Sequence, residues 1–171
     1  ELTGQYTKLV SVEMIEAVGA EYFETFFRAC ASLVQPGGLV AVQAITVADQ
    51  RFEAARVAPD FIKRYVFPGS CIPSIGALTA ASSRATDLRL VDVEDLTPHY
   101  AKTLASWRHN LDRRADEVAA ITTESFRRLW RFYLSYCEGG FLERHTGLVQ
   151  LVFARPDWRG QIARPVTNQG G

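Results

Sequence analysis

The sequence has few cysteines and no excess of charge of either sign. Its three cysteines lie far apart without a C-x-x-C pair, which excludes a disulfide scaffold, argues against a zinc site and favours a reducing compartment. Nineteen basic residues balance nineteen acidic ones, so the basic surplus typical of nucleic-acid-binding proteins is missing. We therefore expect no nucleic acid partner, and we expect Cys30, Cys71 and Cys137 to be small buried apolar side chains.

Long apolar runs and familiar catalytic loops are missing as well. No uninterrupted apolar run approaches the ~20 residues of a membrane span, and no signal-peptide pattern opens the chain, so we expect a cytoplasmic protein. No G-x-S-x-G occurs, and Gly37 and Gly38 precede a predicted strand instead of following one, which is the wrong order for a dinucleotide or P-loop fingerprint. His109 and His145 have no partner at metal-ligand spacing, so no metal is expected.

The hydrophobic fraction is 47% of 171 residues, enough to fill a core, and its periodicity predicts an α/β fold. An apolar run over 8–14 predicts a strand covered on both faces, 21–34 a helix with one apolar face, and 39–45 a second buried strand. Together they form the βαβ unit of a parallel sheet. Further along, the pattern predicts a helical insertion near 46–85 with an exposed segment at 47–60 and a helix from Ser74 to about Arg84, a strand over 88–96, a long helix from Thr97 to about Val118, a helix over 126–137 ended by Gly139 and Gly140, and a strand over 148–153.

Four strands are few for a complete α/β domain, and the order looks like the second half of one. The chain begins with Glu1 instead of Met and reaches a strand almost at once, so we expect a piece cut from a longer chain. The last residues, 156–171, look like a flexible tail. Because a half sheet leaves an apolar edge strand, we expect a dimer or a fold completed by another copy.

Polar residues follow the first two predicted strands, where open α/β sheets bind their ligands. Glu13 and Glu16 come after the first strand, and Gln43 and Ile45 lie at the end of the second. A carboxylate just past a buried strand is easily desolvated, and its pKa is then open to tuning. The alternative is that both glutamates only favour the N-terminus of the next helix.

A second candidate lies at the start of the predicted helix after Thr97. His99 and Tyr100 there can reach a polar ligand, although a lone histidine is more often a solvated side chain. A basic cluster follows, for which a solvated helix face is the simpler interpretation and anionic phospholipid headgroups are the alternative. Trp107 and Trp130 are predicted on the core faces of their helices. The cluster comprises Arg108, Arg113, Arg114, Arg127, Arg128 and Arg131.

Four blocks in this order resemble the C-terminal part of the cyclopropane-fatty-acyl-phospholipid synthases, a branch that includes the mycolic acid cyclopropane synthases. The resemblance covers residues 5–155. It implies a class I S-adenosylmethionine-dependent methyltransferase fold, Rossmann-like, of which residues 1–155 carry about strands four to seven. The blocks are S-V-E-M-I-E-A-V-G at 11–19, Y-V-F-P-G-S-C-I-P-S at 65–74, P-H-Y-A-K-T-L at 98–104 and Y-L-S-Y-C-E-G-G-F at 133–141.

The resemblance also implies a reaction. Such enzymes transfer a methylene from S-adenosylmethionine to the cis double bond of a phospholipid acyl chain, with a bound bicarbonate as base. Glu16 and Tyr100 match the family's catalytic and bicarbonate-binding glutamate and tyrosine, and Ile45 matches the residue whose backbone holds the anion. Gln43 departs from the histidine of several members, which puts the bicarbonate network in doubt because glutamine does not titrate.

The resemblance places the cofactor site upstream. The glycine-rich cofactor loop, the ribose-binding acid and a cysteine supplied by many members match nothing in this chain, so we expect the 171-residue piece alone to be inactive and to bind S-adenosylmethionine poorly. Two alternatives stay open: a non-catalytic lipid- or partner-binding remnant, and a related methyltransferase that does not close a ring. A cyclopropane synthase and a related methyltransferase would both act on the unsaturated acyl chains of phospholipids, with peripheral contact at the inner membrane face.

Overall fold

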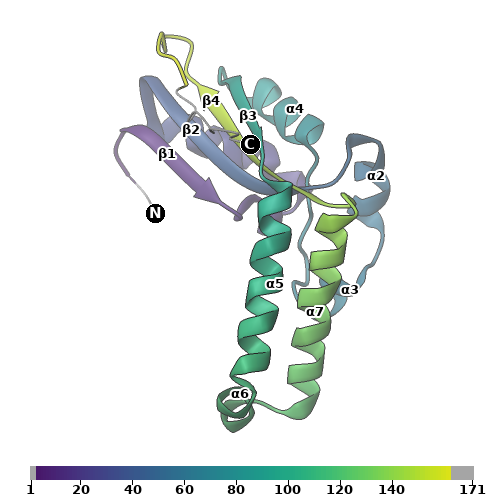
Figure 1. Ribbon diagram of the computed structural model, residues 1–171. Coiled ribbons are helices and arrows are strands. Elements are labelled where there is room, and N and C mark those ends of the chain that lie inside the picture. Colours follow the sequence, from purple (N-terminus) through teal and green to yellow (C-terminus); the bar gives the residue numbers. More distant parts are fainter. Residues whose placement is uncertain (1–2, 163–171) are drawn as a thin grey trace, which may run out of the picture.

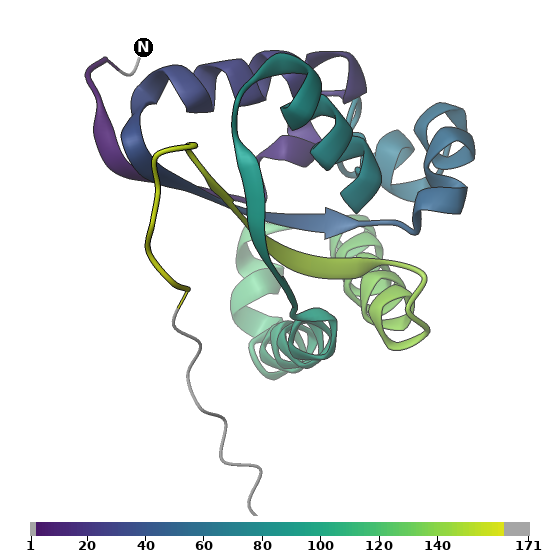
Figure 2. The same cartoon turned by 90° about the horizontal axis from the view of Figure 1, so that it is seen from above.

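The computed structural model describes residues 3–162, which form a four-stranded mixed sheet with helices on both sides (Figures 1 and 2). Helices α1 and α4 cover one face of the sheet, and a helical hairpin projects from the other side at one end. In chain order the elements are β1 (Tyr6–Val12), the short 3-10 turns η1 (Ile15–Ala17) and η2 (Ala20–Tyr22), α1 (Phe23–Leu33), β2 (Val34–Thr46), α2 (Asp49–Val57), α3 (Phe61–Tyr65), α4 (Ile75–Ala85), β3 (Arg89–Asp95), α5 (Thr97–Arg113), α6 (Ala115–Ile121), α7 (Glu124–Leu142) and β4 (Gly147–Ala154).

The strand order β1-β2-β4-β3 confirms the predicted βαβ unit. β1 and β2 are parallel neighbours joined by α1, whereas β4 runs antiparallel between β2 and β3. The last strand therefore lies inside the sheet, and its burial reflects this: Leu151 and Phe153 are almost completely buried. The carboxyl ends of β1 and β2 lie together at one edge, next to the start of the hairpin (Figure 1).

Two glycines let β2 begin earlier than predicted. The register with β1 moves from Tyr6 opposite Val34 to Lys8 opposite Leu39, so the start of β2 carries extra residues. Gly37 has φ 73°, a conformation that favours glycine. A Cβ on Gly38 would lie 2.5 Å from Cγ1 of Val34 and 2.8 Å from the carbonyl oxygen of Thr7. The predicted break at these glycines is therefore a distortion inside one long strand.

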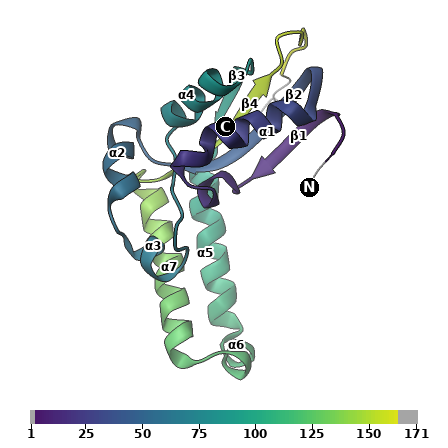
Figure 3. The ribbon, with the colours of Figure 1, turned by 180° about the vertical axis from the view of Figure 1, so that it is seen from behind.

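The larger core lies between the sheet and the α1–α4 layer, which Figure 3 shows in front of the strands. Phe27 of α1 packs edge-to-face on Phe153 of β4, with ring centroids 5.1 Å apart. A second core joins the hairpin helices to the end of β4. Its buried members are Ala101, Leu104, Leu134, Phe141 and Leu148.

Several sequence predictions are wrong in detail. β1 was expected to be covered on both faces, yet Val10 is 69% and Val12 59% exposed, because the described elements cover only the face on which Leu9 packs against the core. The prediction of an exposed segment at 47–60 is confirmed, since most of these residues are exposed; the segment forms α2, of which Phe52 packs against the core. Trp107 was expected on a core face and is 48% exposed.

The hairpin helices also end at other residues than predicted. The long helix after Thr97 ends at Arg113, and α6 then turns the chain. α7 passes through Gly139 and Gly140 to Leu142, because Gly140 lies close to the Thr146 hydroxyl and has no side chain to clash with it. Of the predicted tail at 156–171, residues 156–162 contain no helix or strand, and 163–171 lie outside the described residues.

Candidate functional site

Two neighbouring parallel strands bring Glu13 and Gln43 side by side. Val12, the last residue of β1, pairs with Gln43 of β2, and the next backbone N–H, that of Glu13, donates to the Gln43 carbonyl oxygen at 2.9 Å. Glu13 has φ 49°, in the left-handed region that non-glycine residues rarely adopt. This turn sends the chain into η1 and leaves the Glu13 side chain within reach of β2 and α5.

The Glu13 carboxylate receives one hydrogen bond on each oxygen. Tyr100 Oη donates to Oε2 at 2.6 Å, and Gln43 Nε2 donates to Oε1 at 2.8 Å. Gln43 is itself held, because its Oε1 accepts from Gln150 Nε2 at 2.8 Å. The two partners of the carboxylate come from different elements, so Glu13, directly after β1, ties the end of this strand to β2 and α5.

Glu16 is held separately, by the backbone. The Ile45 N–H donates to Glu16 Oε1 at 2.6 Å, whereas Glu16 Oε2 is buried with no hydrogen-bond partner among the described atoms. Burial raises the pKa of the Glu16 carboxyl, and the neighbouring Glu13 charge adds to this, although the hydrogen bond from Ile45 opposes it. An oxygen that lacks a partner in a buried place is free to accept a proton or a donor from a ligand.

Tyr100 reaches the site from the first turn of α5. Pro98 occupies the start of this helix, where its missing N–H costs nothing. The Tyr100 ring packs on Phe141 of α7, with centroids 4.8 Å apart, and on Trp107 at 6.3 Å. Desolvation, together with the hydrogen bond to Glu13, holds the pKa of Tyr100 well above its usual range. The phenol therefore stays protonated and acts as a donor.

Next to Tyr100 the hairpin presents a half-buried wall of aromatic and thiol groups. The Tyr133 ring lies tilted against that of Trp130, with centroids 4.9 Å apart, and Tyr133 and Cys137 belong to the same apolar cluster. Burial raises the pKa of Tyr133 to about 12 and that of Cys137 to about 11, so both are neutral at physiological pH. The carboxylates thus face a surrounding of low polarity, in which their charge acts over a longer range than in water.

The structure brings most of the predicted site residues together through three hydrogen bonds, one at Glu16 and two at Glu13. Glu16 bonds to Ile45, while Tyr100 and Gln43 both bond to Glu13 instead of Glu16. Gln150 was missed, although a lone polar residue inside the apolar run 148–153 is a usable signal. His99 is exposed and takes no part in these contacts. In the arginine cluster, Arg108, Arg127 and Arg131 pair with Glu138, Glu124 and Asp112 respectively.

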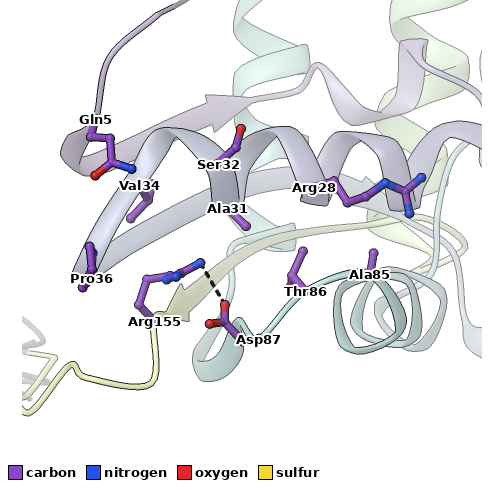
Figure 4. Close-up of a pocket in the computed structure, with 10 residues that line it drawn as sticks. All are labelled: Gln5, Arg28, Ala31, Ser32, Val34, Pro36, Ala85, Thr86, Asp87 and Arg155. Carbon is purple, nitrogen blue, oxygen red and sulfur yellow. Dashed lines mark ion pairs between the residues drawn. The ribbon is translucent and has the colours of Figure 1, made fainter.

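A separate cavity lies at the opposite end of the sheet. Its volume is about 510 Å³, and it opens between the end of α1, the start of β2 and the loop before β3 (Figure 4). Arg155 and Asp87 form an ion pair of 2.9 Å across it. No residue of the carboxylate site lines this cavity, so the chemistry argued from Glu13 and Glu16 does not extend to it.

The described part of the chain contains neither a metal-binding cluster nor a helix that could span a membrane. Residues 3–162 hold no cluster of three or more histidine, cysteine or acidic side chains that could bind a metal ion. Within the same residues no helix combines the length and apolar character needed to cross a bilayer.

The residues present do not fit a bound bicarbonate. The donors that the resemblance assigns to that anion are Tyr100, Gln43 and the Ile45 N–H, and each of them already donates to a glutamate of the chain. A third negative group beside two carboxylates would also meet charge repulsion. The described strand ends likewise carry carboxylates, with no glycine-rich loop for the S-adenosyl group.

Comparison with known proteins agrees with the fold and the order of the motifs. The family model described as mycolic acid cyclopropane synthetase matches residues 1–151. A solved structure of mycolic acid cyclopropane synthase CmaA1 in complex with SAH and CTAB superposes with a TM-score of 0.82 at 24% identity, over 91% of this chain and 57% of that one. The expected class I methyltransferase fold is thereby confirmed.

Curated relatives give the same assignment at higher identity. Tuberculostearic acid methyltransferase UfaA1 of Mycobacterium tuberculosis is 42% identical over 91% of this chain, a probable fatty acid methyltransferase of Pseudomonas putida 36% over 97%, and the cyclopropane-fatty-acyl-phospholipid synthase of Escherichia coli 30% over 91%. The chain spans 36%, 42% and 39% of the length of these relatives. It belongs to the mycolic acid cyclopropane synthetase family of S-adenosylmethionine-dependent methyltransferases.

Proposed function

We propose that this chain is the part of an S-adenosylmethionine-dependent methyltransferase that binds the acyl chain, and that the enzyme modifies the cis double bond of unsaturated phospholipid acyl chains. The observation that carries this proposal is the pair of carboxylates, Glu13 and Glu16, held at the end of the sheet beside an aromatic wall. A hydrocarbon substrate suits the wall, and a substrate that becomes positively charged suits the carboxylates.

The chemistry needs both features. S-adenosylmethionine, when bound, supplies an electrophilic methyl group. As the π electrons of the acyl double bond form a new bond to that carbon, its bond to sulfur breaks, S-adenosylhomocysteine is left behind, and the neighbouring acyl carbon carries a positive charge. Fixed negative groups in a water-poor site stabilise such a charge, and a base must then remove one proton. Removing it from the new methyl group closes a cyclopropane ring or, after a 1,2-hydride shift that moves the charge to the methyl-bearing carbon, leaves a methylene group. Removing it from the chain leaves a methyl branch on a chain that is still unsaturated.

Both products gain one CH2 group, so the choice between ring closure and methylation without a ring needs a separate argument. The resemblance in the sequence favours ring closure with bicarbonate as base. The relatives named above favour the other ending, because those at 42% and 36% identity carry fatty acid methyltransferase names, whereas the cyclopropane synthase is 30% identical. Methylation without ring closure is therefore our second candidate, and the same experiment separates the two.

A non-catalytic lipid-binding remnant explains the site less well. Burying carboxylates costs free energy unless they are well bonded, and Glu16 keeps a buried oxygen without a partner. Lipid binding alone would gain nothing from a buried carboxylate, whereas a reaction that passes through a positively charged substrate is stabilised by it.

The hairpin supplies a surface for the membrane that holds such a substrate. α3 and α7 lie side by side (Figure 1), and Phe61 contacts Phe132 and Tyr136 with ring centroids 4.9 and 5.5 Å apart. Ile121, at the far end of the hairpin, is 82% exposed. We place this surface at the cytoplasmic face of the inner membrane, since three free cysteines suit a reducing compartment.

The test is methyl-deuterated methionine fed to cells that express the complete gene product containing this segment. We expect labelled CD2 or CD3 groups in phospholipid acyl chains, and NMR of the purified lipid distinguishes a cyclopropane from a methyl-branched or methylene chain. Unlabelled acyl chains would contradict the proposal. The 171-residue chain alone is expected to be inactive, and calorimetry showing micromolar S-adenosylmethionine binding to it would refute that part.

A further inference from the structure

We infer that the Glu13 carboxylate takes the place of bicarbonate and serves as the enzyme's own base. This inference rests on the proposed function and deepens it. The family resemblance assigns the base to a bound anion, whereas here the donors for that anion hold a side chain.

The hydrogen bonds around Glu13 leave it able to accept a proton. Tyr100 Oη and Gln43 Nε2 each donate to a different oxygen, and a carboxylate oxygen has two lone pairs. One acceptor position on each oxygen is therefore left for a proton from the substrate. Tyr100 and Gln43 act as positioning residues, since they fix the plane of the carboxylate.

Among the described residues, the three donors that the resemblance assigns to bicarbonate are all engaged by glutamates, and only the second N–H of the Gln43 amide is left over. Ile45 N–H, the third donor, is engaged by Glu16 at 2.6 Å. A bicarbonate that replaced Glu13 in this network would have to break two hydrogen bonds, both involving a charged group, and would then lie between two glutamates.

The backbone indicates that a glutamate at this position is maintained against a conformational cost. Glu13 has φ 49°, and glycine adopts this conformation without strain. Strained residues that persist in a folded chain are often found at functional sites. The strain also supplies a useful variant, because Glu13→Gly removes the carboxylate and suits the backbone.

The proton step balances without a further reactant. After methyl transfer the substrate carries the positive charge, and one C–H bond beside it breaks. Its proton goes to an oxygen of Glu13, while its electron pair forms the ring bond or the new double bond. Neutral Glu13 then returns the proton to water when the product leaves.

The first measurement is bicarbonate binding, which does not depend on turnover. The complete gene product is titrated into carbon-13-labelled bicarbonate, and NMR line broadening reports the bound ion. We expect no saturable binding to the wild type or to Glu117→Gln, a control on exposed α6, and saturable binding to Glu13→Gly. Saturable binding to the wild type, or none to Glu13→Gly with its fold verified by circular dichroism, overturns the inference.

The second measurement is turnover with and without added bicarbonate in carbon-dioxide-depleted buffer. Wild type and Glu117→Gln should be indifferent to bicarbonate. Glu13→Gln, which keeps the shape but loses the base, should be slower by about 100-fold or more in either buffer. Glu13→Gly should be equally slow without bicarbonate and recover in part with it.

The two proposals fail in different ways. A wild type that labels no acyl chain refutes the proposed function, and the binding measurement still decides whether Glu13 fills the anion's place. A wild type that labels acyl chains but needs bicarbonate, or a Glu13→Gln variant with wild-type turnover, refutes the role of Glu13 alone.

Discussion

Glu16 combines two properties that rarely occur together, a hydrogen bond from the backbone and a buried oxygen without a partner. In the proposed mechanism its charge lies next to the reacting carbon. We expect Glu16→Gln, in the complete gene product, to lower turnover by about 100-fold or more, since the variant is neutral but similar in shape. Product analysis by mass spectrometry checks this, with Glu21→Gln on the exposed surface as control. Unaltered turnover would remove Glu16 from the mechanism.

The same residue sets a pH dependence of stability. Because burial raises its pKa above the ordinary 4.5, the folded state favours the neutral carboxyl. The stability that this group contributes is present below 4.5 and is lost as the pH rises through its folded pKa. We therefore expect the free energy of unfolding of the wild type, relative to Glu16→Gln, to fall between acidic and neutral pH. Urea titrations across this range measure it, and a relative stability that rises with pH would contradict the burial.

Thr97 illustrates a buried hydroxyl with a structural role. It is 4% exposed, accepts a hydrogen bond from the Leu148 N–H at 3.1 Å, and its contacts with Asp95 lower the pKa of that carboxyl. Thr97→Val keeps the shape and leaves the Leu148 N–H without this partner, so we expect a loss of about 1–3 kcal/mol in urea unfolding. Thr103→Val is the control, because the Thr103 hydroxyl bonds only within its own helix, to the His99 carbonyl. Equal losses of stability in Thr97→Val and Thr103→Val would argue against the structural role of the Thr97 hydroxyl.

The residues of the site could be found from the sequence, but their pairing could not. Position after a predicted strand identified Glu13 and Glu16, and the motif identified Tyr100 and Gln43. Which glutamate receives the tyrosine depends on the left-handed turn at Glu13 and on the tilt of α5 against the sheet. Neither is encoded in hydrophobic periodicity.

Among the elements, the α5–α7 pair depends on a small apolar seam. Leu104 is 1% exposed and belongs to the cluster that joins the hairpin to β4. We expect Leu104→Ala to cost about 2–5 kcal/mol, measured by urea unfolding, because the deletion leaves a cavity between packed helices. Leu142→Ala is the matched control, since Leu142 is 65% exposed and its loss should have little effect. A similar loss of stability in Leu104→Ala and Leu142→Ala would show that the packing around Leu104 does not stabilise the hairpin.

Element types were predictable where periodicity was long and strong, as in α1, α5, α7 and β4. The boundaries that failed depend on contacts between distant segments. Gly140 lies inside a helix where Thr146 packs closely against it, and Gly38 lies inside a strand where Val34 and Thr7 leave no room for a side chain. Glycine in a sequence signals a break or a close approach, and only the packed structure distinguishes the two.

At the scale of the whole molecule, the hairpin should touch the lipid surface. Exposed Ile121 lies at its far end, near Arg113 and Arg114 in the chain. We expect the complete gene product to float with anionic vesicles, and Ile121→Asp to bind roughly tenfold more weakly, because one large apolar side chain is worth about 1.5–3 kcal/mol on burial. Val57→Asp, on α2 and 72% exposed, is the control. Equal weakening by both variants would assign the effect to net charge.

β1 presents the other large exposed surface, an apolar strand edge. Only β2 pairs with it among the described strands, and Val10 and Val12 project from it largely exposed. Unpaired strand edges of this kind associate with other chains, and inserted charges prevent it. We expect the 171-residue chain to sediment above its monomer mass of 19.1 kDa, and Val10→Lys to restore the monomer. Val57→Lys, on α2, controls for added charge. A monomeric wild type would contradict association through this edge, and association that survives Val10→Lys would place the contact elsewhere.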